Sequence, residues 1–286
     1  MTKSDSTSDT AASGAYSRPS PQPIEPPPYQ RLAMERLAMV EYSTFTMASP
    51  LLRLLPKGDG HPVLFLPGFY GSDDSTEQMR AALKRKGHAV HGWRLGQNTG
   101  PHAHVIEGTS RRLADLHERY GLKVSLVGWS LGGIFARELA REHPDAVRQV
   151  ITMGAPFRFR PGDRGHASAL YDMIAPREDP FPGRDVGEDD RSPLEVPSTA
   201  IYTRTDGIVR WHACIDAAGP FRENIEVFGT HSGLGYNVAA IFAVADRLSQ
   251  PEGTWTPFRA KRAVRHLYPR PVSWVPARRP GRWKLA

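Results

Sequence analysis

Short runs of strand length alternate with longer runs of helical character along most of this chain. The strand-length runs lie at 62–67 (PVLFLP), 89–95, 123–128, 149–154, 199–204 and 224–228. The longer runs predict helices at 74–86, 107–120, 131–142 and 235–249. Asp74 is the expected N-cap of the first helix, with Glu77 completing a capping box. This alternation predicts an α/β fold, with a mostly parallel sheet flanked by helices on both faces.

Three segments fall outside the alternation. Residues 1–28 are rich in Ser and Pro and predict a disordered arm. Residues 30–55 predict a helix that Pro50 ends or kinks, and that packs on the main domain or, alternatively, lies on a membrane surface. Residues 157–197 are rich in Pro, Gly, Asp and Arg, contain one short helix at 166–174, and predict a cap or lid. The main domain is therefore expected to span residues 29–258.

The amino-acid composition indicates the cellular compartment in which we expect the protein. The 286 residues are 40% hydrophobic and 23% charged, which is typical of a soluble globular protein. The single cysteine, Cys214, excludes an internal disulfide and fits a reducing compartment. No run is apolar enough for a signal peptide or a membrane span. We therefore expect a cytoplasmic protein.

The positive charge is concentrated in the last part of the chain. Residues 259–286 hold nine Lys or Arg and no Asp or Glu, so 28 basic and 30 acidic residues remain elsewhere. The net charge of +7 therefore says little about the main domain, and no nucleic-acid partner is expected. The tail is predicted to be disordered. The alternative is an anchor that brings the protein to the periphery of an anionic membrane, with tryptophans at the interface.

The sequence Gly128–Trp129–Ser130–Leu131–Gly132 matches the G-x-S-x-G pattern of a nucleophile elbow. The pattern follows a predicted strand and opens a predicted helix, which is the context that such an elbow requires. A sharp turn between strand and helix needs small neighbours around the serine, and Gly128 and Gly132 provide them. Ser130 is therefore the candidate nucleophile.

A serine hydroxyl needs a base, and the base needs an orienting acid. In nucleophile-elbow enzymes the partners follow in the order serine, acid, histidine. Asp206 and His231 follow in that order, each directly after a predicted strand. Because parallel strands place their following loops at one edge of the sheet, both side chains are expected near Ser130.

Other acidic residues and histidines fit this pattern less well. Asp216 and His212 lie beyond the turn at Gly207, and the histidines upstream of Ser130 reverse the expected order. An acidic run within 157–197 is typical of a solvated surface. The residues set aside on these grounds are Asp216, His212, Asp185, Glu188, Asp189, Asp190, His88, His91, His102 and His104.

Two backbone N–H groups are needed to stabilise a tetrahedral oxyanion. Leu131, directly after the nucleophile, is expected to supply one. Phe69, in the glycine-containing loop after the first strand, is expected to supply the other.

Five stretches together resemble bacterial α/β hydrolases of the lipase and esterase type: FLPGFYGSD, LVGWSLGG, ITMGAPF, YTRTDGIV and GTHSGLGYN. The resemblance runs from about residue 51 to 258. It implies the α/β-hydrolase fold and the triad Ser130, Asp206 and His231, with Tyr70, Pro156 and Phe157 lining the substrate site. Trp129 departs from the histidine that many lipases carry before the serine. Dehalogenases and epoxide hydrolases of this fold would carry Asp at position 130.

These patterns predict a carboxylic-ester hydrolase that works through an acyl-enzyme on an ester or lipid-like substrate. Acyl transfer or thioester hydrolysis by the same triad remains open, as does a non-catalytic binding protein on this fold. No metal signature, dinucleotide fingerprint or P-loop is present, so no cofactor is expected. The oligomeric state is left undetermined.

Overall fold

The computed structural model describes residues 23–160, 162–175, 188 and 191–269. Most of the predicted arm, much of the predicted lid and the last part of the basic tail lie outside the described residues. So do Asp185, Asp189 and Asp190.

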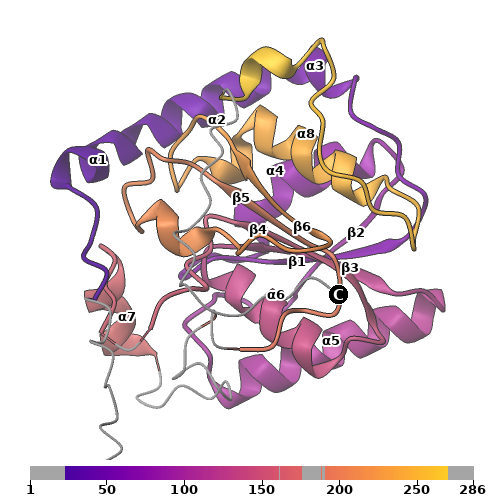
Figure 1. The fold of residues 1–286 in the computed structure, drawn as a ribbon, viewed down its shortest axis with the longest axis horizontal. Helices are drawn as coiled ribbons and strands as arrows, with labels where there is room; N and C mark the ends of the chain where they lie inside the picture. Colours follow the sequence, from indigo (N-terminus) through magenta and orange to yellow (C-terminus); the bar gives the residue numbers. More distant parts are fainter. Residues whose placement is uncertain (1–22, 161, 176–187, 189–190, 270–286) are drawn as a thin grey trace, which may run out of the picture.

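A six-stranded sheet forms the centre of the molecule (Figure 1). Its order is β2-β1-β3-β4-β5-β6, and every neighbouring pair of these strands is parallel. The bounds are β1 Pro62–Leu66, β2 Ala89–Gly92, β3 Val124–Trp129, β4 Val147–Met153, β5 Ser198–Tyr202 and β6 Arg222–Glu226. The predicted α/β fold is therefore confirmed, with β3 and β4 at the centre of a wholly parallel sheet.

Helices cover both faces of the sheet (Figure 1). One face packs on α5 and α6 through a core that includes Leu113, Leu116 and Phe135. The other packs on α4, α8 and the N-terminal helices through a core that includes Met79, Ile241 and Phe45. The helices are α1 Tyr29–Met34, α2 Ala38–Met47, α3 Ser49–Leu52, α4 Asp73–Lys84, α5 Ala103–Tyr120, α6 Leu131–Glu142, α7 Ser168–Ile174 and α8 Val238–Leu248. None of the helices in the described ranges is both long and apolar enough to cross a membrane.

The start of α4 corrects one local prediction. Its N-cap is Ser72, whose side chain accepts a hydrogen bond from the Asp74 N–H, so Asp74 lies inside the first turn. Asp73 instead accepts hydrogen bonds from the N–H groups of Trp93 and Arg94. Trp93 and Arg94 directly follow β2, which ends at Gly92. The two bonds therefore connect the edge strand to α4.

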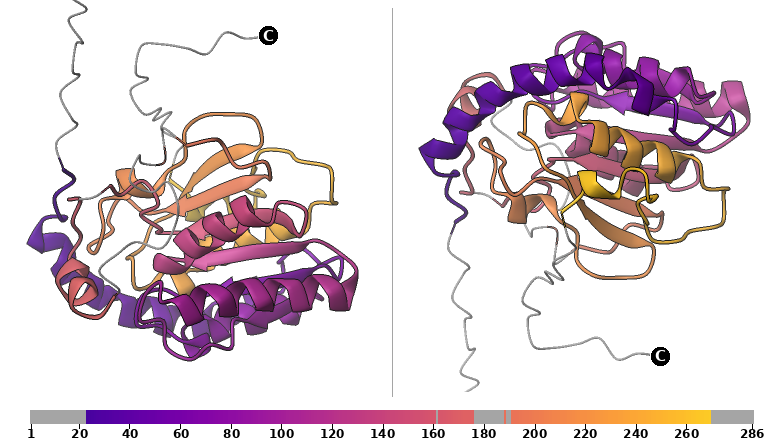
Figure 2. Two further views of the ribbon diagram at one scale, coloured as in Figure 1. Left: turned by 90° about the horizontal axis from the view of Figure 1, so that it is seen from below. Right: turned by 90° about the horizontal axis from the view of Figure 1, so that it is seen from above.

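The segment before β1 wraps around one end of the molecule. The short 3-10 helix η1 Glu35–Leu37 joins α1 to α2, and together these helices lie beside the loops that follow β5 and β6. Residues 23–28 contact the insertion after β4, where the Arg164 N–H donates to the Ile24 carbonyl at 2.8 Å. The Tyr29 and His166 rings lie 5.1 Å apart, which places α7 near the start of α1 (Figure 2).

Part of the basic tail is packed. Val264 is buried in the core beside α8, and the Tyr268 hydroxyl donates to the Ala239 carbonyl at 2.7 Å. The short 3-10 helix η5 Arg265–Leu267 lies between these contacts. The described part of the tail therefore packs on the domain beyond the predicted boundary at residue 258.

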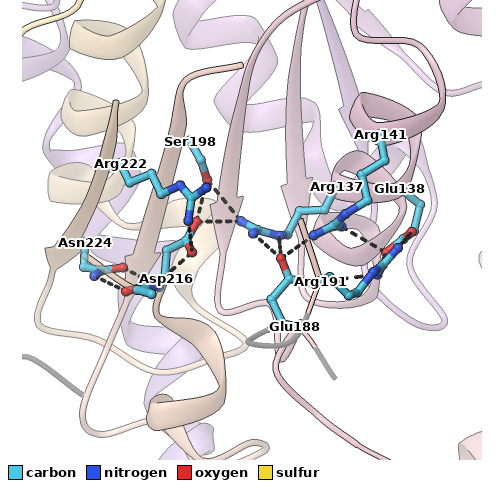
Figure 3. Close-up of polar contacts among 10 residues, drawn as sticks. Arg137, Glu138, Arg141, Glu188, Arg191, Ser198, Asp216, Arg222 and Asn224 are labelled. Carbon is cyan, nitrogen blue, oxygen red and sulfur yellow. Dashed lines mark hydrogen bonds and ion pairs between the residues drawn. The ribbon is translucent and has the colours of Figure 1, made fainter. Parts of the chain in front are cut away.

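A buried charge network joins α6 to the chain that returns from the 157–197 insertion (Figure 3). Arg137 donates to Asp216 at 2.9 Å and to Ser198 at 3.1 Å, and also pairs with Glu188. Burial alone would raise the pKa of the Asp216 carboxyl, but Arg137 and Arg222 outweigh it and hold that pKa below its usual value. Around this centre, Glu188 also pairs with Arg141, and Glu138 pairs with Arg191. The helix that begins next to Ser130 is thereby fixed at its far end.

Replacing Arg137 by Met should destabilise the fold by about 3–5 kcal/mol, because Asp216 and Glu188 would stay buried without their shared cation. Urea unfolding followed by circular dichroism measures this free energy. Arg111→Met, at an exposed position of α5, is the matched control and should change stability by less than about 0.5 kcal/mol. A loss of similar size in the two variants would contradict the assigned role of the network.

Candidate active site

Ser130 occupies a sharp turn between β3 and α6. Its backbone has φ 51° and ψ −121°, a strained conformation for a residue with a side chain. The Ser130 N–H donates to the Met153 carbonyl at 2.8 Å, which ties the turn to β4. A Cβ at Gly132 would collide with the Leu66 carbonyl, and one at Gly128 would collide with the backbone of α6. The predicted elbow geometry is thus present, and it depends on both glycines.

Ser130, His231 and Asp206 form one continuous hydrogen-bonded line. The Ser130 Oγ lies 3.0 Å from His231 Nε2, and His231 Nδ1 lies 2.6 Å from Asp206 Oδ2. Asp206 Oδ1 accepts from the N–H groups of Ile208 at 2.9 Å and Val209 at 2.8 Å, which fixes the carboxylate. Ser130 is partly exposed, whereas His231 and Asp206 are buried. The arrangement suits proton transfer from a reachable hydroxyl to a sheltered imidazole.

The electrostatic surroundings of His231 favour its protonated form. Burial alone would lower the pKa of His231, but the charge and hydrogen bond of Asp206, together with the charge of Glu35, raise it above its ordinary value. An imidazolium formed next to Ser130 is thereby stabilised.

The loop after β1 passes directly over Ser130. A Cβ added to Gly68 would lie 3.1 Å from the Ser130 Cβ, so only glycine lets the loop approach this closely without displacement. The following N–H groups are those of Phe69 and Tyr70, and the Tyr70 N–H already donates to the Asn98 carbonyl at 2.7 Å. Within the described residues the Phe69 N–H has no acceptor, and the Leu131 N–H is at the open start of α6. Both N–H groups remain available to an oxyanion.

The three residues expected to line the substrate site have different surroundings. Tyr70 is half exposed, and its ring lies edge-on to Phe69, which also contacts Tyr171 of α7 at 5.3 Å between ring centroids. Pro156 is buried. Phe157 is buried in the core on the α6 side, and the Arg137 guanidinium lies 4.1 Å from the centre of its ring. These contacts assign Phe157 to packing beneath the charge network.

Three further side chains hold the histidine loop, and the sequence reasoning did not find these roles. Trp129, noted only as a departure from lipases, donates its indole N–H to the His231 carbonyl at 3.2 Å. Glu35 and Glu41, from the N-terminal helices, accept hydrogen bonds from the backbone around His231. Such contacts join residues far apart in sequence, and no local sequence pattern predicts them.

The residues that the sequence reasoning set aside lie in other contacts. Asp216 and Glu188 belong to the network around Arg137. His212 stacks on Trp211, His91 lies 2.9 Å from the Tyr120 hydroxyl, and His102 stacks on His104. His88 is buried and directly precedes the edge strand β2. In the part of the chain that the structure describes, no group of His, Cys, Asp and Glu side chains could hold a metal ion.

A family model described as alpha/beta hydrolase fold matches residues 61–181. This stretch includes the loop after β1, the elbow at Ser130 and the start of the insertion. No curated protein matches the chain.

Solved structures of lipases have a similar fold. Lipase B of Aspergillus fumigatus is similar at 17% identity and a TM-score of 0.53, over 68% of this chain and 53% of that one. This chain thus corresponds to about half the length of that lipase. Two smaller lipases are also similar, each with a TM-score of 0.48 over 68% of this chain. They are BlEst2 of Bacillus licheniformis at 16% identity over 94% of its chain, and a monoacylglycerol lipase of Paleococcus ferrophilus at 13% over 96%.

Proposed function

Because the chain has the α/β-hydrolase fold, we propose that it is a serine hydrolase that cleaves carboxylic esters. One observation carries the proposal: the line from Ser130 Oγ through His231 to Asp206 next to two available N–H donors. Fold alone does not define an activity, so the argument depends on these side chains. A non-catalytic role on this fold would not require three polar groups in this order.

In the proposed reaction, the Ser130 Oγ attacks the ester carbonyl while its proton moves to His231 Nε2. Asp206 keeps the proton on Nδ1 and stabilises the imidazolium that forms. The Phe69 and Leu131 N–H groups receive the oxyanion. His231 then protonates the departing alcohol, leaving an acyl group on Ser130. A water molecule deprotonated by His231 cleaves this acyl-enzyme and restores the serine.

The surroundings of Ser130 support an apolar acyl group in the substrate. Phe69 and Tyr70 directly follow Gly68, which lies against the serine, and Tyr171 brings α7 onto Phe69. Leu170 and Met173 of α7 are exposed, which gives this short helix an apolar outer surface. We include in the proposal that α7 forms part of a lid over the acyl site.

A fluorophosphonate probe tests for the activated serine. The folded protein should be labelled, and mass spectrometry should place the adduct on Ser130. Ser130→Ala and heat-unfolded protein should remain unlabelled, because reactivity requires the base as well as the hydroxyl. A natively folded protein that takes up no probe, or that carries it on another residue, would refute the proposal. Hydrolysis of esters of increasing acyl length, with a competing alcohol in a parallel series, then separates hydrolysis from acyl transfer.

A further inference from the structure

The carboxylate of Glu35 joins the two loops that carry Asp206 and His231. One oxygen, Oε1, accepts from the Gly207 N–H at 2.8 Å and from the His231 N–H at 3.0 Å. The other, Oε2, accepts from the Ser232 N–H at 2.8 Å. Glu35 thus binds the residue after the candidate acid and the candidate base itself.

Glu41, further along the same helical segment, holds the other side of the histidine loop. Its carboxylate accepts from the Thr230 N–H at 3.3 Å and from the Thr230 hydroxyl at 2.5 Å. It also accepts from the Asn237 side-chain amide at 3.3 Å, and that amide donates to the Phe228 carbonyl at 2.6 Å. The Thr230 hydroxyl in turn accepts from the Gly233 N–H at 3.0 Å. The turn from Phe228 to Gly233 is therefore held by one carboxylate.

The two loops have glycines where the N-terminal helices approach. A Cβ on Gly207 would collide with the Arg31 carbonyl, and one on Gly233 would collide with the Glu41 carboxylate. The backbone of each loop is thus in van der Waals contact with this segment. A side chain at either glycine would therefore push the N-terminal helices away from the loops.

The charge of Glu35 also acts on the imidazole. Two titratable groups act on His231 within the described structure: Asp206, from the loop after β5, and Glu35, from η1. Both raise the pKa of His231, against burial, which lowers it. Glu41 contacts the neighbouring Thr230 and is not among the charges that shift this pKa.

Building on the proposed function, we propose that Glu35 and Glu41 are positioning residues of the catalytic centre. Their carboxylates bind backbone N–H groups and fix the positions of the loops that carry the acid and the base. Neither carboxylate is expected to touch the substrate. The N-terminal helices Tyr29–Met47 are then part of the active-site scaffold of this enzyme. A misplacement of about 1 Å in a catalytic group can cost roughly 100-fold in rate, so contacts that position the acid and base loops can govern activity.

The variants Glu35→Gln and Glu41→Gln test this role, with Glu118→Gln on the exposed face of α5 as the control of equal charge change. A Gln amide turns one acceptor oxygen into an N–H donor that would face a backbone N–H. Both variants should lose roughly 10- to 100-fold in kcat with little change in KM, because the substrate contacts remain. The control should match wild type in both constants.

The pH dependence separates the two carboxylates. His231 must be neutral to accept the serine proton, so kcat/KM falls as pH drops through the His231 pKa. Without the Glu35 charge this pKa falls, so the acid limb of Glu35→Gln should lie at lower pH than in wild type. Glu41→Gln should keep the wild-type limb. An NMR titration of the His231 imidazole, assigned with His231→Gln, should show the same shift without requiring turnover.

A folded Glu35→Gln that keeps the wild-type kcat and the wild-type His231 pKa would overturn the proposal. If Glu35→Gln does not fold, Glu35→Asp decides: its shorter side chain keeps the charge, so a low kcat supports positioning and a wild-type kcat overturns it. A wild-type protein that hydrolyses no ester defeats the proposed function. The NMR titration would still show whether Glu35 acts on His231.

Discussion

Ser130→Ala is expected to lower kcat for ester hydrolysis by about 10⁴- to 10⁶-fold. The variant loses the only hydroxyl within hydrogen-bond distance of His231 Nε2 in the described structure. Binding and the oxyanion donors would remain, and they account for the residual rate. The alanine should not destabilise the fold, because the Ser130 N–H bond to Met153 is a backbone contact.

The measurement is kcat and KM with a chromogenic ester that wild type hydrolyses, on variants of equal purity. Ser110→Ala on α5 is the control, since it lies outside the elbow and outside the loops that carry Asp206 and His231. A kcat for Ser130→Ala within tenfold of wild type would show that another group attacks the ester.

Asp206→Asn is expected to lower kcat/KM by about 10⁴-fold while leaving the fold intact. The Asn oxygen can take the place of Oδ1 and keep the hydrogen bonds from Ile208 and Val209. Its amide NH₂ must then face His231 Nδ1, which would have to accept that hydrogen bond. The proton of the neutral imidazole would move to Nε2, the atom that should receive the serine proton. The base would be present in the wrong tautomer.

Steady-state kinetics and the rate of fluorophosphonate labelling both measure this loss, since both need the neutral Nε2. Unfolding in urea serves as the check that Asp206→Asn keeps its structure. If labelling and hydrolysis stayed within tenfold of wild type, Asp206 would not be the orienting acid.

The order of strands and helices could be predicted because each element depends mainly on the residues within its own segment. Each apolar run was short enough to be a strand, and the glycine-rich elbow at Ser130 needs small neighbours that the sequence shows directly. The parallel sheet then brought Asp206 and His231 to the same edge, as chain order had indicated. Their catalytic roles stay predictions until the variants are measured.

Other features depend on contacts that no local pattern encodes. Each of the four side chains in the run Ser72–Asp73–Asp74–Ser75 could cap α4. Asp73 instead binds the N–H groups that follow β2, and Ser72 is the N-cap. The resemblance places Phe157 in the substrate site, yet its ring is buried in the core next to the Arg137 guanidinium. Glu35 looks like any surface carboxylate of a helix, because its partners are 172 to 197 residues away along the chain.

That separation also sets an order of assembly during synthesis. The helices that carry Glu35 and Glu41 leave the ribosome before the loop around His231, which is made almost 200 residues later. Until then Phe45, which is buried in the finished core, has only part of its partners. Contacts of such long range form late because the closure of a long loop must precede them. Helices α1 and α2 are therefore expected among the last elements to dock, and their docking brings Glu35 and Glu41 onto the loops of the proposed catalytic centre.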